Sequence, residues 1–211
     1  QFLGSGGNSL QVGSNALARS LRSMAIGNSS LASNVDSMAV GNYAKATNAS
    51  SIALGNGSLS RADNAIAIGV GADAYKIGAT VIGYSAYSTE SETVVLGDVA
   101  TASATLGVAI GSSAAVDGAS GIAIGPSAWA TKANSIALGA QSTASHSNSA
   151  AIGPPDHAGA VTATTATNQI RLGTTNHLVS VPSLTASTML KADSAQNVSS
   201  VPNGTGMLTN D

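Results

Sequence analysis

The chain has 211 residues and is weakly charged, with 9% Asp, Glu, Lys and Arg and a formal net charge of -2. So little charge argues against nucleic acid or an anionic membrane surface as a direct partner. Cysteine is absent, which excludes disulfides and thiolate metal sites, and no apolar run approaches the roughly 18 residues of a membrane-spanning helix.

A glycine recurs at every fourteenth position from Gly13 to Gly153, which predicts a small structural unit stacked on copies of itself. The residue before each glycine is aliphatic, and small residues follow it, as at Ala44 and Ala46. A coil of this length has room for two strands of about four or five residues and two tight turns. Successive coils would pair equivalent strands in parallel, about 4.8 Å apart. Residues 1–153 are therefore predicted to form an all-β solenoid, or β-roll.

Positions in each coil can be numbered from the repeated glycine, taken as zero. Period-two alternation predicts that positions -3, -1, +3 and +5 face the interior of the coil. Position -2 is then predicted to face outward, and alanine fills it in eight of eleven coils. Two large aliphatic residues per coil do not obviously offset the entropy of ordering fourteen residues. A second apolar surface is required, and homo-oligomerisation with cyclic symmetry is its simplest source.

The repeat register breaks after Gly153, where Pro154 to His157 block continuation of a strand. The coil motif returns at Gln169 to Gly173, twenty residues on instead of fourteen, which predicts six inserted residues. Residues 177–182 alternate like one more strand, and residues 185–195 are compatible with a short helix. We therefore divide the chain into a repeat head at 1–153, an insert with a final strand-like coil at 154–182, and a neck or transition to another module at 183–211. Because the N-terminus lies inside the repeat pattern, we expect a fragment of a longer protein.

One segment carries a family resemblance. Residues 134–142 read N-S-I-A-L-G-A-Q-S and resemble N-S-V-A-I-G-x-x-S, the head motif of the YadA-type trimeric autotransporter adhesins. Ile136 and Leu138 replace Val and Ile of that motif, and related variants fill every coil from residue 8 to residue 153. The resemblance implies a left-handed parallel β-roll in a homotrimer, associated with virulence. It also implies a position on a stalk at the Gram-negative cell surface, anchored to the outer membrane through parts absent from this fragment. The segment after residue 153 departs from the usual neck sequence of the family.

The same resemblance implies binding of host extracellular-matrix proteins such as collagen, laminin or fibronectin. Carried over residue by residue, it reaches five positions: Asn134, Ser135, Ala137, Gly139 and Ser142. Exposed aromatic residues are typical of binding hot spots, and four of the six aromatics are predicted to project outward shortly after the repeated glycine: Tyr43, Tyr84, Tyr87 and Trp129. Two alternatives stay open, namely that these aromatics only cover neighbouring coils and that the chain is a structural rod or fibre spacer without its own ligand.

Signals for catalysis or cofactor binding are weak. Residues 69–74 fit the dinucleotide fingerprint G-x-G-x-x-A, but they lie in register with the coils and precede no predicted helix. His146, His157 and His177 lack the spacing of metal ligands, and Asp156 with His157 has no accompanying nucleophile elbow. We therefore expect no catalytic residue, no metal and no cofactor.

Overall fold

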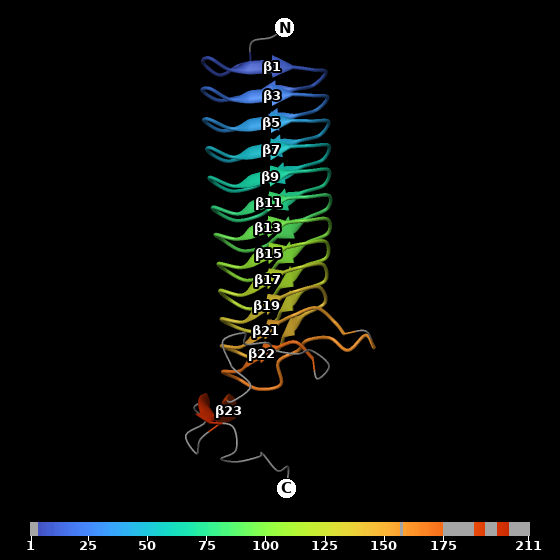
Figure 1. The fold of residues 1–211 in the computed structure, drawn as a ribbon. Helices are drawn as coiled ribbons and strands as arrows, with labels where there is room; N and C mark the ends of the chain where they lie inside the picture. Colours follow the sequence, from blue (N-terminus) through green and yellow to red (C-terminus); the bar gives the residue numbers. More distant parts are fainter. Residues whose placement is uncertain (1–3, 157, 175–187, 193–197, 203–211) are drawn as a thin grey trace. The chain divides into compact units, whose positions relative to one another are not determined.

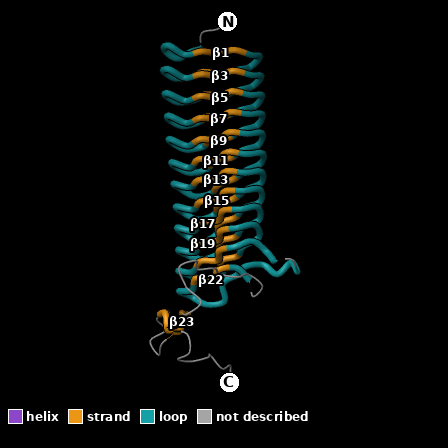
Figure 2. The backbone as a smooth tube through the Cα atoms, viewed as in Figure 1, coloured by secondary structure: helices purple, strands orange, loops and turns teal. Residues whose placement is uncertain are grey.

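The computed structural model describes residues 4–156, 158–174, 188–192 and 198–202. The chain divides into two compact units, Gln1–His177 and Leu178–Asp211. In the first unit, fourteen-residue coils stack on one another as a parallel β-solenoid (Figure 1). Figure 2 shows the short strands of each coil separated by turns and loops. The predicted all-β solenoid is thus confirmed.

Each regular coil contributes one strand of three residues and one strand of two residues, and these form two separate parallel sheets. The strands of the first sheet, here called the long-strand sheet, are β1 (Leu10–Val12), β3 (Met24–Ile26), β5 (Met38–Val40), β7 (Ile52–Leu54), β9 (Ile66–Ile68), β11 (Thr80–Ile82), β13 (Val94–Leu96), β15 (Val108–Ile110), β17 (Ile122–Ile124), β19 (Ile136–Leu138), β21 (Ala150–Ile152) and β22 (Ile170–Leu172). The strands of the second, the short-strand sheet, are β2 (Leu17–Ala18), β4 (Leu31–Ala32), β6 (Lys45–Ala46), β8 (Leu59–Ser60), β10 (Asp73–Ala74), β12 (Tyr87–Ser88), β14 (Thr101–Ala102), β16 (Ala115–Val116), β18 (Trp129–Ala130) and β20 (Thr143–Ala144).

The repeated glycine is required by the close stacking of the turns. Gly41 has a φ of 138°, and a Cβ atom added to it would lie 2.3 Å from the carbonyl oxygen of Gly55 in the next coil. A side chain at this position would therefore meet both a strained backbone and a neighbouring main chain. Each turn is closed by a backbone hydrogen bond, as from Ala44 N to the Gly41 carbonyl oxygen at 3.3 Å.

The interior of the coil is filled by small residues, which corrects part of the predicted face assignment. Ala39 at position -2 is fully buried inside the coil, whereas Met38 and Val40 on either side of it face outward and are partly exposed. Ala44 and Ala46 at positions +3 and +5 face inward, as predicted. The prediction was wrong for positions -3, -2 and -1 because alternation holds within a strand but does not continue through the glycine turn.

One of the larger interior side chains, Val116, lies against two glycines. Val116 is fully buried, and its Cγ1 atom lies 3.0 Å and 2.9 Å from the positions that Cβ atoms would take on Gly107 and Gly121. The coil is so narrow here that Val116 packs directly against these glycines, and valine is the largest fully buried side chain among the described residues. Leucine or isoleucine at every coil would not fit, and the large aliphatic residues therefore lie outside.

The last coil of the first unit contains the predicted insertion. Strand β22 pairs with β21 in parallel and places Ile170 opposite Ala150, an offset of twenty residues. Six extra residues are thus confirmed, and they lengthen the turn that follows Gly153. Asp156 organises this loop, because its Oδ1 atom accepts hydrogen bonds from the backbone N–H groups of Ala158 and Ala160 at 3.0 and 2.9 Å.

In the second unit, β23 (Thr188–Ala192) and β24 (Val198–Pro202) pair in an antiparallel fashion. The short helix predicted within residues 185–195 is therefore wrong for residues 188–192, which form a strand. A helix of about ten residues is marginal on its own, whereas the adjacent strand offers a full ladder of hydrogen bonds. The strand predicted at residues 177–182 lies outside the described residues.

Candidate ligand-binding surfaces

The outward side of the long-strand sheet, here called the aliphatic face, is apolar along the solenoid apart from the hydroxyl of Thr80. Two columns of side chains, at positions -3 and -1, project from it. Several of these side chains are well exposed, including Leu54 (39%), Leu96 (45%) and Leu138 (41%). The column at -1 consists of Val12, Ile26, Val40, Leu54, Ile68, Ile82, Leu96, Ile110, Ile124, Leu138 and Ile152. Monomeric proteins rarely expose apolar patches larger than a few hundred Å². This face therefore has the character of a contact surface.

The outward side of the short-strand sheet, here called the mixed face, has a varied composition. Its side chains come from positions +4 and +6 of each coil. Position +4 carries Leu17, Leu31, Lys45, Leu59, Asp73, Tyr87, Thr101, Ala115, Trp129 and Thr143. Charged, aromatic, hydroxyl and aliphatic residues thus alternate along a single column, which is incompatible with one repeated packing partner.

Arg61 and Asp73 organise one part of the mixed face. The Nε and Nη2 atoms of Arg61 donate hydrogen bonds to the two carboxylate oxygens of Asp73 at 2.8 and 2.9 Å. The hydrogen bond to Asp73 raises the pKa of Arg61, so the guanidinium stays charged. Arg61 and Lys76 each lie 5.6 Å from the ring centroid of Tyr75, a distance typical of cation–π contacts. Beside this group lies a shallow hollow of about 360 Å³ lined by Lys45, Thr47, Leu59, Arg61 and Tyr75.

A second organised group lies further along the mixed face. The indole Nε1 of Trp129 donates a hydrogen bond to Asp117 Oδ2 at 2.7 Å, and the hydroxyl of Ser103 donates to Asp117 Oδ1 at 2.6 Å. Trp129 remains 47% exposed. The indole is thus held in one orientation while part of its surface is free, an arrangement that lowers the entropy cost of a contact.

Three of the five motif residues carried over from the family lie inside the coil. Ser135 and Ser142 are fully buried, and their hydroxyls donate to the carbonyl oxygens of Lys132 and Gly139 at 2.6 and 2.9 Å. Both serines therefore close turns.

The other three motif residues, Ala137, Gly139 and Asn134, differ in how far they are exposed to solvent. Ala137 is fully buried in the interior, and Gly139 has a φ of 129° in the turn. Asn134 is exposed in the left-handed conformation, and its Nδ2 atom donates to Asn148 Oδ1 at 3.0 Å. The motif thus builds the coil, and among the five carried-over residues only Asn134 has a side chain placed to reach a ligand.

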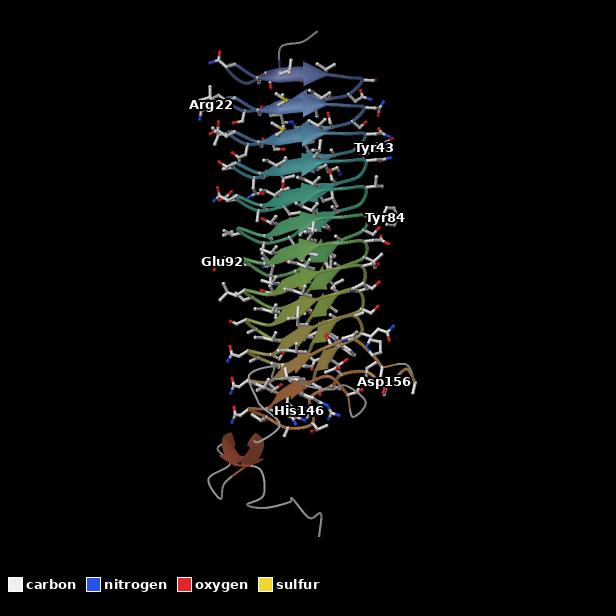
Figure 3. All side chains as sticks on the ribbon, in the orientation of Figure 1. Arg22, Tyr43, Tyr84, Glu92, His146 and Asp156 are labelled. Atoms are coloured by element: carbon white, nitrogen blue, oxygen red, sulfur yellow. The ribbon has the colours of Figure 1, made fainter. Side chains whose placement is uncertain are left out.

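The four aromatics predicted to project outward are exposed, which confirms that placement. Their exposed fractions are 55% for Tyr43, 61% for Tyr84, 39% for Tyr87 and 47% for Trp129. They do not form a single patch. Tyr43 and Tyr84 lie along one edge of the solenoid, opposite the edge that carries Arg22 and Glu92 (Figure 3). Tyr87 and Trp129 lie on the mixed face three coils apart, or about 14 Å at the usual strand spacing.

Sequence reasoning missed Tyr75, Lys45 and Arg61 as candidate ligand residues. Tyr75 is 47% exposed, and the hollow places it together with Lys45 and Arg61 although they come from three different coils. Alignment of the coils by their fourteen-residue period would have revealed this proximity, because Thr47, Arg61 and Tyr75 all occupy position +6.

The weak catalytic signals have structural explanations. Gly69 and Gly71 of the dinucleotide-like segment lie in a turn, and the short strand β10 follows them where a phosphate-binding fold would have a helix. Among the described residues, His, Asp and Glu side chains form no group of three that could hold a metal ion. The described part of the chain also has no helix that could span a membrane.

Comparison with known proteins agrees with this geometry. The family model described as YadA head domain repeat (2 copies) matches residues 32–58, 60–86, 117–142 and 130–154. These residues match YadA head domain repeats, and the head of this chain is similar to that of a YadA-type adhesin. A solved structure of the collagen-binding domain of the Yersinia adhesin YadA is similar to this head, with a TM-score of 0.53 and 25% sequence identity. The similarity covers 81% of this chain and 82% of that one. No curated protein sequence matches the chain significantly.

Proposed function

We propose that this YadA-type head acts as a homotrimeric adhesin that binds host extracellular-matrix proteins, with collagen as the first candidate. The observation that carries the proposal is the similarity of four fifths of the chain to a collagen-binding head. Laminin and fibronectin are further candidates of the same class.

The homotrimer is supported by the aliphatic face. Its two columns continue through every coil and contain no charged residue. Three such faces turned toward a common axis would remove the exposed aliphatic side chains from water, and each buried side chain of this kind contributes about 1.5 to 3 kcal/mol. Cyclic symmetry brings each copy of the face against identical neighbours without leaving one uncovered.

The mixed face supports the adhesive role. It lies on the other side of the coil from the aliphatic face, so it stays accessible when the aliphatic faces meet. Its exposed side chains would then be repeated around three chains. Weak contacts repeated in this way produce strong attachment through avidity.

We place the head at the surface of a Gram-negative cell, carried on the outer membrane by parts of the adhesin beyond these residues. The similarity of the head to the YadA-type adhesins supports this location. It would present the mixed face to the extracellular matrix of a host.

A structural rod or fibre spacer is the competing function. It is favoured by the interior position of Ser135, Ala137 and Ser142, because a motif that builds coils needs no ligand to explain it. Binding of the purified protein to immobilised collagen, laminin and fibronectin separates the two. Saturable binding to at least one of them supports an adhesin, whereas a spacer binds none.

A further inference from the structure

The hollow on the mixed face combines an unpaired cation with an apolar floor. Strand β6 places Lys45 beside Leu59 of β8, and Thr47 and Arg61 flank them at position +6. Leu59 is half-buried. Tyr75, from the following coil, completes the wall of this hollow of about 360 Å³.

The two cations of the hollow differ in their partners. Arg61 is held by both carboxylate oxygens of Asp73 and leans over the ring of Tyr75. Within the described residues, the ion pairs are Arg22 with Asp36 and Arg61 with Asp73, so the ammonium of Lys45 has no carboxylate partner. The hollow therefore offers one uncompensated positive charge.

The chemistry of this site fits one anionic group on a short aliphatic stem. The carboxylate would pair with the ammonium of Lys45, and its methylene groups would pack on Leu59 and the ring of Tyr75. A sulfated polysaccharide is a poorer fit because such chains are held by several uncompensated cations, and the protein has a net charge of -2.

We propose that this hollow binds the carboxylate of an acidic side chain from an extended segment of a protein partner. The inference rests on the proposed adhesive function and deepens it, because it names the part of the mixed face that recognises the partner and the chemical group recognised. In the proposed trimer, three such hollows lie at the same height.

Peptide titration followed by methyl NMR tests this directly. The probes are acetyl-Gly-Pro-Glu-Gly-Pro-amide and the same peptide with Gln in place of Glu, and the readout is the methyl resonances of Leu59. We expect saturable shifts with the Glu peptide and at least about tenfold weaker binding of the Gln peptide, as for a charge-assisted contact. Lys45→Gln should weaken binding of the Glu peptide by about the same factor. Lys132→Gln is the matched control and should have no effect, since Lys132 is exposed in a turn and not on the mixed face.

Several results would overturn the inference: no movement of the Leu59 resonances up to the solubility limit, equal shifts with both peptides, or equal effects of the two lysine variants. Tighter binding of a heparin oligosaccharide than of the Glu peptide would overturn the choice of an acidic protein segment. Collagen binding is measured separately on the same protein. Collagen binding without a Leu59 response refutes the hollow alone, whereas a Leu59 response without matrix binding supports the hollow and refutes the matrix-binding function.

Discussion

The two outward faces of the solenoid differ in how strictly their residues repeat. Position -1 on the aliphatic face is Val, Ile or Leu in every coil, whereas position +4 on the mixed face changes from leucine to lysine, aspartate, tyrosine and tryptophan. Backbone pairing is equally regular in both sheets, so the fold alone does not explain the difference. A strictly repeated apolar face indicates one shared packing partner along the whole rod, and a varied face indicates freedom from such a partner. We therefore infer self-association on one face and recognition on the other.

The largest expected effect comes from a charge on the aliphatic face. Ile68→Asp should prevent self-association, because it would bury an unpaired carboxylate at a cost of several kcal/mol in each of three copies. Light scattering and thermal melting should show a smaller species and a strongly lowered Tm. Retention of the wild-type mass and Tm would show that Ile68 is not in a contact.

The neighbouring residue on the same strand tests the interior. Ala67 is fully buried within the coil, so Ala67→Leu should overpack it and destabilise the fold by about 1 to 3 kcal/mol. Chemical denaturation of the variant measures this cost. A variant as stable as the wild type would mean that the coil has room for large side chains, contrary to the structure.

Truncation of exposed aromatics tests recognition separately from folding. The triple change of Tyr84, Tyr87 and Trp129 to alanine should preserve the Tm, because none of these side chains fills the interior. The binding free energy for a matrix protein should become less favourable by about 1 to 2 kcal/mol, as for other hot-spot truncations. Surface plasmon resonance on immobilised collagen provides the measurement. Unchanged affinity would contradict a role of these three aromatics in binding and leave Asn134 and the turns as the candidate contacts.

A charge on the mixed face should matter little for stability. Thr101 lies at position +4 of its coil and faces outward, so Thr101→Asp should change stability by no more than about 0.5 kcal/mol. Melting curves recorded beside those of Ile68→Asp provide the comparison. Equal losses in the two variants would contradict the assignment of the two faces.

The smallest effect concerns pH. A hydrogen bond from Arg22 lowers the pKa of Asp36, so any stabilisation from this exposed pair is present above the ordinary Asp pKa of about 4 and is lost as the pH falls through the lower folded value. Asp36→Asn should remove that small acid-dependent change in Tm and leave the rest of the pH profile intact. If the Tm of Asp36→Asn at neutral pH falls by more than the loss of this exposed ion pair explains, Asp36 has a role in packing.

Much of the fold could be predicted from the sequence, because the fourteen-residue glycine period fixes both coil length and parallel pairing. The twenty-residue step between Gly153 and Gly173 likewise revealed the insertion. The orientation of the long strands could not be inferred in the same way. Both Ala39 and its neighbours Met38 and Val40 are apolar, and hydrophobicity does not distinguish the interior of a coil from a surface that meets another chain.

The candidate site was predicted less completely than the fold. Exposure of single aromatics such as Tyr43 followed from their position in the coil. The hollow around Lys45 did not, because its lining comes from different coils and becomes contiguous only when they stack. Ser142, at position +3, was expected inside the coil, but the burial of Ser135 at position -4 was not predicted, since it depends on the turn carbonyl that accepts its hydroxyl.

The molar mass of the native protein tests the central claim most directly. Multi-angle light scattering of the purified wild-type chain should give about three times the chain mass of 20.4 kDa, because the aliphatic face requires identical partners. A folded, monodisperse species of one chain mass would contradict self-association through this face. A dimer would preserve the need for a partner but contradict the trimeric assembly proposed for this head.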